Sequence, residues 1–240
     1  MADHILSATN ISKHFGGFVA LEGVDFHVAT GERVGLLGPN GSGKSTLVNC
    51  LTGTLRNDTG EIMFLGERIE GLVTHQRIRR GVARTFQIPR PFRSMTVLEN
   101  VEIALLYAGH ATSREGHTDE AFTVLDQLGL RNHADMSAGQ LTQVDLRKLE
   151  LARALAARPK LLIADEAMAG LSHAEVDEIL KLLFQLNGAG ISIVMIEHIM
   201  YAVMKFSQRI AVLVAGRKIA DGDPQAVVKN PDVEKAYLGE

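Results

Sequence analysis

A short glycine-rich stretch carries the residues best suited to bind an anion. An apolar run at 34–37 precedes it, and a helical pattern at 44–52, ended by Gly53, follows it. The stretch fits the pattern G-x-x-x-x-G-K-[ST] and consists of Gly38, Pro39, Asn40, Gly41, Ser42, Gly43, Lys44, Ser45 and Thr46. Because N–H groups at a helix start favour negative charge, it predicts a phosphate-binding loop rather than a glycine-rich turn that binds nothing. Lys44 would reach β- and γ-phosphates, and the Ser45 hydroxyl would ligate Mg²⁺.

Two neighbouring carboxylates follow a second apolar run. Asp165 and Glu166 come directly after residues 161–164, which we predict to form a buried strand. In parallel α/β sheets, ligands bind at the carboxyl ends of the strands. Asp165 is therefore predicted to hold Mg²⁺, and Glu166 to orient or deprotonate an attacking water. The alternative, an acidic pair in a surface turn, is less favoured in a chain that also carries a phosphate loop.

A histidine occupies the corresponding place after another strand. His198 follows residues 191–196, which we also predict to form a strand. Most lone histidines are structural, and this chain has nine. The position at the end of a strand nevertheless favours a contact of His198 with the γ-phosphate or its attacking water.

The overall composition is that of a folded, mildly acidic protein. The chain has 240 residues, 46% of them hydrophobic, which is enough for one well-buried α/β domain. A net charge of −3 gives no basic surface for nucleic acid. The single cysteine, Cys50, fits a reducing compartment. No signal peptide is expected, and the longest apolar tract, residues 191–204, is interrupted by Glu197 and His198, so work at a membrane would require a partner.

The pattern of apolar and polar residues changes near Thr96. Before it, residues 5–34 alternate apolar and polar side chains with glycines at expected turns, and residues 60–66 repeat this pattern, which predicts one small antiparallel sheet. From Thr96 a capping box opens a helix to about residue 107, and a polar loop at 109–117 precedes a second helix at about 119–128. This middle stretch reads as a helical insert in an α/β domain.

The last third of the chain alternates strands and helices. This order, from about Lys160 onward, predicts a parallel sheet with crossover helices. Ser172 begins a second capping box, and its helix ends near Gly188. Asp223 and Asn230 each precede a proline, which predicts two short final helices.

The chain resembles the nucleotide-binding subunit of an ABC transporter over nearly its whole length. The resemblance is carried by four features in this order: the phosphate loop, Gln87, the Asp165-Glu166 pair and His198. The resemblance implies an α/β fold with a RecA-like P-loop NTPase core in a single ABC ATPase domain, 1–240. Within it, an N-terminal antiparallel β-subdomain would take residues 1–35 and 57–72, and an α-helical subdomain residues 88–155. It also implies ATP and Mg²⁺ as cofactors, and ATP hydrolysis in a head-to-tail pair of cassettes.

The same resemblance assigns two further residues. Gln87 follows the strand-like residues 82–86, and the resemblance implies that its amide ligates Mg²⁺. Residues 13–16 look like the family's adenine-stacking segment, which makes Phe15 the expected base-stacking residue. Phe18 is close by and could take the same role.

A narrower resemblance concerns the solute. Residues 83–87, 93–100, 169–172 and 230–239 look like the branched-chain amino-acid importer type, with cassettes for urea or short amides as near neighbours. This type implies a peripheral subunit at the cytoplasmic face of the inner (plasma) membrane. Its partners would be a second cassette, identical or paralogous, two permease subunits and, indirectly, an extracytoplasmic solute-binding protein, but no nucleic acid. A soluble ABC ATPase acting as an assembly factor, as in iron–sulfur cluster biogenesis, and an exporter cassette are the alternatives.

The family's signature, L-S-G-G-Q, is altered in this chain. Counting back from the helix at 149–155 places it at 141–145, where both glycines are missing and Asp145 replaces the glutamine. Residues 136–140 match better but lie about one and a half helical turns too early, so spacing favours 141–145. The signature offers a helix N-terminus to the γ-phosphate on the facing cassette. We therefore expect a complete ATP half-site but a weakened signature, and a heterodimer that hydrolyses mainly at one site.

Overall fold

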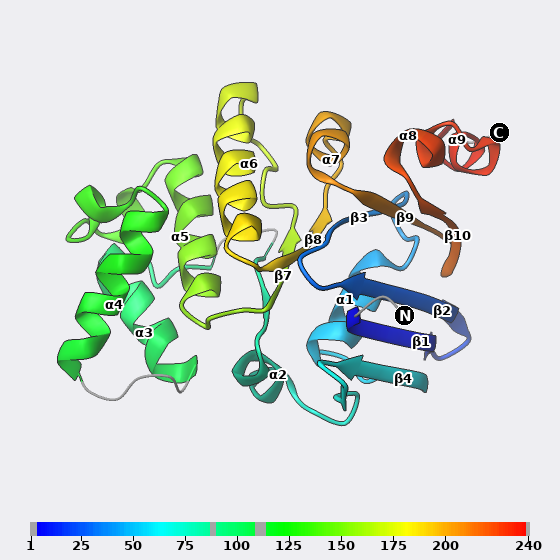
Figure 1. The fold of residues 1–240 in the computed structure, drawn as a ribbon, viewed down its shortest axis with the longest axis horizontal. Coiled ribbons are helices and arrows are strands. Elements are labelled where there is room, and N and C mark those ends of the chain that lie inside the picture. Colours follow the sequence, from blue (N-terminus) through cyan, green and yellow to red (C-terminus); the bar gives the residue numbers. More distant parts are fainter. Residues whose placement is uncertain (1–3, 87–89, 109–113, 239–240) are drawn as a thin grey trace.

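Two β-sheets and a helical region make up the molecule (Figure 1). The computed structural model describes residues 4–86, 90–108 and 114–238. One sheet has four strands in the order β2-β1-β4-β5, and the other has six in the order β10-β9-β3-β8-β7-β6. Helices α3, α4 and α5 stand together at one end, at the left of Figure 1.

The small sheet is antiparallel, as the alternating pattern predicted. Its strands are β1 (His4–Phe15), β2 (Phe18–Ala29), β4 (Thr59–Phe64) and β5 (Glu67–Arg68). The β1–β2 hairpin closes at the pair Phe15 and Phe18. Gly23, expected in a turn, instead lies inside β2 with φ +59, where the pairing register with β1 shifts. A glycine with positive φ accommodates such a bulge without breaking the strand.

The larger sheet is parallel except at one edge. Its strands are β3 (Arg33–Leu37), β6 (Val82–Arg84), β7 (Leu161–Asp165), β8 (Ser192–Ile196), β9 (Arg209–Val214) and β10 (Arg217–Gly222). Strands β6, β7, β8, β3 and β9 run parallel, and β10 pairs antiparallel with β9. The predicted parallel sheet is confirmed, whereas the β9–β10 hairpin was not anticipated. Because β3 belongs to the larger sheet, residues 33–35 are not part of the small antiparallel sheet in which we expected them.

The helical region begins with the predicted capping box, in which Thr96 and Glu99 bond each other's backbone N–H. It contains α3 (Val97–Ala108), α4 (Arg114–Gln127) and α5 (Gln143–Leu155). The expected loop at 109–117 is too long, because α4 already begins at Arg114. The buried residues Ala121 and Leu125 give this largely polar helix a face that packs into the core, and packing outweighs the polar composition.

The remaining α-helices lie among and beside the strands of the two sheets. They are α1 (Lys44–Thr52), α2 (Thr74–Arg80), α6 (His173–Gly188), α7 (Met200–Phe206), α8 (Pro224–Val228) and α9 (Pro231–Leu238). The predicted helix at 44–52 and the two short final helices are thereby confirmed. None of the helices in the described ranges is long and apolar enough to cross a bilayer.

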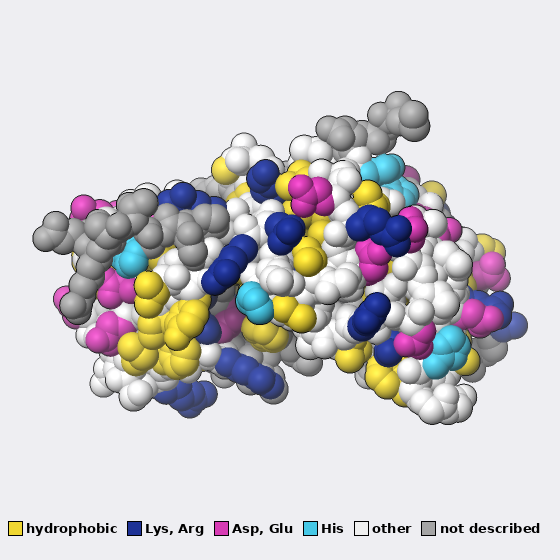
Figure 2. Space-filling model, turned by 90° about the horizontal axis from the view of Figure 1, so that it is seen from below, with side chains coloured by type: hydrophobic (Ala, Val, Ile, Leu, Met, Phe, Trp, Pro, Cys, Tyr) yellow, Lys and Arg dark blue, Asp and Glu magenta, His cyan; other side chains and the backbone are white. Residues whose placement is uncertain are grey.

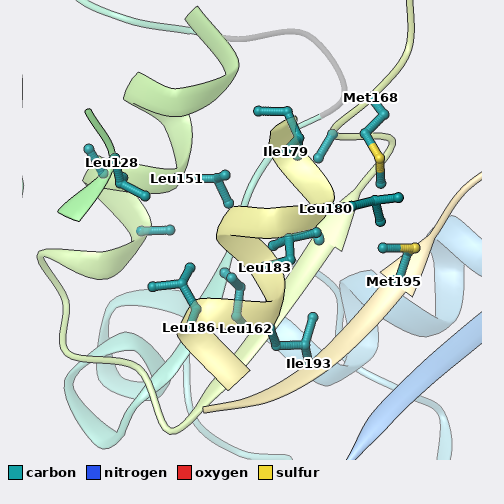
Figure 3. Close-up of a cluster of buried hydrophobic side chains, with 14 of the residues drawn as sticks. Leu128, Leu151, Leu162, Met168, Ile179, Leu180, Leu183, Leu186, Ile193 and Met195 are labelled. Atoms are coloured by element: carbon teal, nitrogen blue, oxygen red, sulfur yellow. The ribbon is translucent and has the colours of Figure 1, made fainter. Parts of the chain in front are cut away.

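Two buried clusters form the core, one on each side of β3. Figure 3 shows part of one of them, with Leu180 and Leu183 of α6 on the side of β7 and β8. The second cluster lies under the small sheet and includes Cys50. Successive residues of β3 belong to different clusters, Leu36 to the second and Leu37 to the first.

Candidate functional site

The glycine-rich loop joins the end of β3 to the start of α1. Its glycines adopt backbone conformations that other residues rarely reach, with φ +149 at Gly38, +76 at Gly41 and +103 at Gly43. A Cβ atom at Gly38 would collide with the carbonyl oxygen of Leu213. The loop therefore needs glycine both for its turns and for close contact with the neighbouring strand.

Lys44 lies folded inside this loop. Its Nζ donates to the carbonyl oxygens of Gly38 at 2.7 Å and Pro39 at 3.0 Å, and the residue is buried. Burial lowers the pKa of Lys44, and the negative charges of Glu166 and Asp165 oppose this shift. A positive charge is thus held at the centre of the loop by carbonyl oxygens.

A pocket of about 230 Å³ opens in front of the loop. It is lined by Phe18, Ala20, Asn40, Gly41, Ser42, Gly43, Lys44, Ser45, Thr46, Asp165, Glu166, Ile196 and His198. The hydroxyl of Ser42 is buried and has no hydrogen-bond partner among the described residues. A buried donor without a partner is costly, so an anion in this pocket would satisfy it.

Most of the residues that we predicted for the site meet in this one pocket. Gly38 and Pro39 lie behind it and hold Lys44. Phe15 does not line the pocket, whereas Phe18 does. Gln87 lies outside the described residues.

Asp165, at the end of β7, is held by an arginine that sequence reasoning missed. Arg84 donates to Asp165 Oδ2 at 2.6 Å through Nη2 and to Asn49 Oδ1 at 2.6 Å through Nη1. The Asp165 N–H donates to the buried Thr85 hydroxyl at 3.1 Å. The only sequence signal for Arg84 was a charged residue at the end of an apolar strand.

The pocket offers oxygen ligands of the kind that Mg²⁺ prefers. The Ser45 hydroxyl and the Asp165 carboxylate both line it. Hydroxyl and carboxylate oxygens are hard ligands suited to a small divalent cation that also binds phosphate oxygens and water. The residues that are present therefore fit a magnesium ion.

Glu166 and His198 form a direct contact at the ends of neighbouring strands. The Nε2 atom of His198 lies 3.1 Å from Glu166 Oε1. The backbone of Glu166 has φ +47, in the left-handed region, and its N–H donates to Ile196 O at 2.9 Å. Such a strained conformation costs about 1 kcal/mol or more and is common at functional sites. The arrangement aims a carboxylate and an imidazole into the same pocket.

Glu197, beside His198, is a second residue whose importance was missed. It is only 3% exposed and accepts a hydrogen bond from the Met168 N–H at 2.8 Å. Burial raises the pKa of Glu197 to about 7, and the nearby Glu166 charge adds to the shift. Its signal in the sequence was an acid inside an apolar tract, which we used only to exclude a membrane span.

The altered signature begins a helix, as the spacing predicted. Thr142 caps α5 and accepts a hydrogen bond from the Asp145 N–H at 3.2 Å. The better sequence match at 136–140 instead packs on residue 93, where the Arg93 carbonyl accepts from the Ser137 hydroxyl and the Gly139 N–H. This geometry agrees with the assignment to residues 141–145.

The Asp145 side chain is engaged by residues of its own chain. The Asp145 carboxylate accepts from the Thr142 hydroxyl at 2.7 Å and lies 3.4 Å from Lys148 Nζ. Lys148 in turn pairs with Glu178 at 2.6 Å. Asp145 is only 8% exposed, and the neighbouring Lys148 partly neutralises its charge.

Comparison with known families gives a direct answer. The model of the ABC transporter family matches residues 21–169. This chain belongs to the ABC transporter family. A second model, for the branched-chain amino acid ATP-binding cassette transporter, matches residues 217–240. Both the broad resemblance and the narrower one inferred from the motifs are confirmed.

Individual relatives match over their full length. The high-affinity branched-chain amino acid transport ATP-binding protein LivG of Escherichia coli K12 is 39% identical over all of both chains. An ATP-binding cassette of an ABC transporter, solved in its ADP conformation, has 34% identity and a TM-score of 0.90 over 99% of each chain. A dimeric cassette in a post-hydrolysis state with ADP and Pi has 27% identity and a TM-score of 0.81, over 91% of this chain and 98% of its own.

The family membership gives the chain its activity. The chain is an ABC ATPase that binds ATP and hydrolyses it to drive transport. The predicted fold, a P-loop NTPase with an N-terminal antiparallel sheet, is confirmed as well.

Proposed function

We propose that this ABC ATPase powers the import of branched-chain amino acids. Within this proposal it works at the cytoplasmic face of the inner (plasma) membrane with a second cassette, two permease subunits and an extracytoplasmic solute-binding protein. Support comes from LivG, a full-length relative named for this transport, and from the family match at residues 217–240. The same relative is named as a transport protein, which favours a transporter over a cytoplasmic assembly factor.

In this proposal the chain is a single ABC ATPase domain. The small sheet with β1, β2, β4 and β5 is its β-subdomain, and α3, α4 and α5 form its helical subdomain. The large sheet, which carries the pocket at the carboxyl ends of β3, β7 and β8, is the RecA-like core.

The contact between Glu166 and His198 carries the proposed mechanism. Lys44 and the loop N–H groups bind β- and γ-phosphates, and Ser45 and Asp165 hold Mg²⁺, with Gln87 as its further proposed ligand. When bound, the ion neutralises charge on the phosphates. Glu166 accepts the proton of an attacking water. His198, whose Nε2 lies 3.1 Å from the Glu166 carboxylate, orients that carboxylate and contacts the γ-phosphate.

The adenine end of the nucleotide is proposed to lie on the β1–β2 hairpin. Phe15 is the residue implied by resemblance, while Phe18 lines the pocket. Both rings are exposed, at 47% and 62%, and so present aromatic faces on which a base can stack. Measuring the ATP affinity of Phe15→Ala and Phe18→Ala separates the two possibilities. Only replacement of the residue that stacks on adenine should weaken ATP binding, by about tenfold.

The permease is proposed to bind a groove between the large sheet and the helical region. The groove has a volume of about 360 Å³, and its walls include Ile78, Arg84, Phe86 and Tyr107. Figure 2 shows hydrophobic side chains gathered at the left of the lower face, on the side of the helical region. Because Arg84 reaches both the groove and Asp165, a partner seated here would be coupled to the site of hydrolysis.

Reconstitution tests the proposal. The cassette is purified from membranes with its co-purifying permeases, placed in liposomes with the binding protein, and supplied with ATP and labelled leucine, urea or a short amide. We expect leucine uptake that Glu166→Gln abolishes while ATP binding persists, with hydrolysis reduced by about 10²-fold or more. Uptake of urea but not leucine would reject the proposed solute. Purification without any integral membrane partner would instead favour the assembly factor, and outward transport would favour an exporter.

A further inference from the structure

The last helix of the chain touches the phosphate loop. Tyr237 lies in α9, and its hydroxyl oxygen accepts a hydrogen bond from the Gly38 N–H at 2.8 Å. The two residues are 199 positions apart. Burial raises the pKa of the Tyr237 phenol, so this hydroxyl is neutral at physiological pH.

Gly38 connects this contact to the lysine of the loop. Its N–H binds Tyr237, while its carbonyl oxygen accepts from Lys44 Nζ at 2.7 Å. The backbone at Gly38 has φ +149, and the adjacent Leu213 carbonyl leaves no space for a side chain. The orientation of Gly38 therefore sets one of the two carbonyl oxygens that hold the lysine, the other being that of Pro39.

Helix α9 is anchored firmly enough to fix the tyrosine. Asn230 accepts from the Asp232 N–H at 2.9 Å at its start, and Val233 is buried in the first core cluster together with Leu37. The same side of the helix borders a cavity of about 550 Å³ that His198 also lines. One face of α9 thus adjoins both the start of the phosphate loop and the strand end that carries His198.

We propose that Tyr237 is a positioning residue, which orients Gly38 and through it Lys44 for binding the phosphates of ATP. The C-terminal helix is then part of the nucleotide site, although it does not line the pocket in front of the loop. This inference rests on the role of Lys44 proposed above. A neutral hydrogen bond of this kind is expected to change ATP affinity by about two- to tenfold.

The test compares Tyr237→Phe with a matched control. Tyr201→Phe removes an equivalent hydroxyl, which donates to Asp177 at 2.9 Å on the surface of α6 and α7. Two properties of the full chain are measured: the Kd for a fluorescent ATP analogue with Mg²⁺, and hydrogen exchange of the Gly38 amide without nucleotide. For Tyr237→Phe we expect a higher Kd and several-fold faster exchange at Gly38, with neither change in Tyr201→Phe.

Three results would overturn the inference: unchanged exchange at Gly38, an unchanged Kd, or a Kd that rises equally in both variants. A lower melting temperature without a change in Kd counts as an unchanged Kd, because it reports only a structural role. Lys44→Ala is measured in parallel. If Lys44→Ala binds the analogue as well as the wild type, the proposed function of Lys44 fails. If it loses binding while Tyr237→Phe keeps it, only the inference about Tyr237 fails.

Discussion

Arg84 bridges Asn49 on the helix after the phosphate loop and Asp165 at the end of β7, with both bonds at 2.6 Å. The side chains of Arg84 and Asp165 are only 15% and 11% exposed. Solvent therefore screens this pair weakly, and the carboxylate that we assign to Mg²⁺ already has a cationic neighbour. The arginine comes from β6, the strand that leads into the helical region.

Replacing Arg84 by alanine should destabilise the chain without nucleotide by about 2–4 kcal/mol, because the buried Asp165 carboxylate loses its hydrogen-bonded partner. Urea denaturation measures this change. Arg217→Ala is the control, since its pair with Glu22 is largely exposed and should contribute less than about 1 kcal/mol. Mg²⁺ with ATP should reduce the deficit of Arg84→Ala by bringing positive charge to Asp165. Equal losses in the two variants would contradict this reasoning.

Gly38→Ala and Gly41→Ala should differ sharply in stability. At Gly41 a methyl group meets nothing within 4 Å, so the cost is the left-handed backbone alone, about 1 kcal/mol. At Gly38 the methyl group meets the fixed carbonyl of Leu213, which should add about 2 kcal/mol or more. Denaturation curves without nucleotide give both values. If Gly41→Ala proves the more damaging, the described loop geometry is wrong.

Glu197 should make stability depend on pH. Its pKa rises from an ordinary 4.5 to about 7 in the folded chain, so the folded state binds more protons than the unfolded state between these values. The free energy of unfolding should therefore fall as pH increases through this window, by up to about 3 kcal/mol.

Glu197→Gln isolates that effect, because its amide oxygen can still accept from the Met168 N–H while the side chain no longer titrates. Unfolding of both proteins is measured from pH 5 to 8 without nucleotide. The wild type should lose stability relative to the variant as pH rises. If the stability of the two proteins changes with pH in parallel, the prediction is wrong. The surroundings of Glu197, which include Arg147, would then stabilise its charged form as well as water does.

The two ATP sites of the assembled transporter should contribute unequally. In the half-site built by this chain, Glu166→Gln should remove most of the hydrolysis, whereas the matching change in a paralogous partner should remove little. The physical reason is that residues 141–145 lack the glycines of the signature, while the Asp145 carboxylate accepts a hydrogen bond from Thr142, the residue that caps the same helix. Steady-state ATP hydrolysis of both mutant complexes measures the asymmetry, and equal losses would reject it.

Local signals in the sequence predicted much of the fold. The helix at Lys44–Thr52 and the strand at Leu161–Asp165 were recognisable because glycines, capping residues and apolar runs determine them nearby. Helix α7 was missed, since its seven residues include several with weak helix propensity. It is stabilised instead by burial of Ala202, Val203 and Phe206, which only the tertiary structure reveals.

The site was predictable where motifs exist and unpredictable where contacts are distant. The phosphate loop, Asp165, Glu166 and His198 follow from strand ends and spacing. Arg84 and Asp165 are 81 residues apart, and no periodicity indicates that their side chains meet. Tyr237 was within a segment recognised by resemblance, yet its bond to Gly38 depends on how α9 packs.

Strand β3 has a mechanical consequence for the whole molecule. Leu36 belongs to the buried cluster under the small sheet, and Leu37 belongs to the cluster that includes residues of α6 and α9. The strand ending at the phosphate loop is therefore shared between both cores. Loss of either core would release the strand from one side. We therefore expect heat to unfold the chain in one cooperative calorimetric transition. ATP bound at the end of this shared strand should raise the melting temperature of that single transition, without separating the unfolding of the two cores.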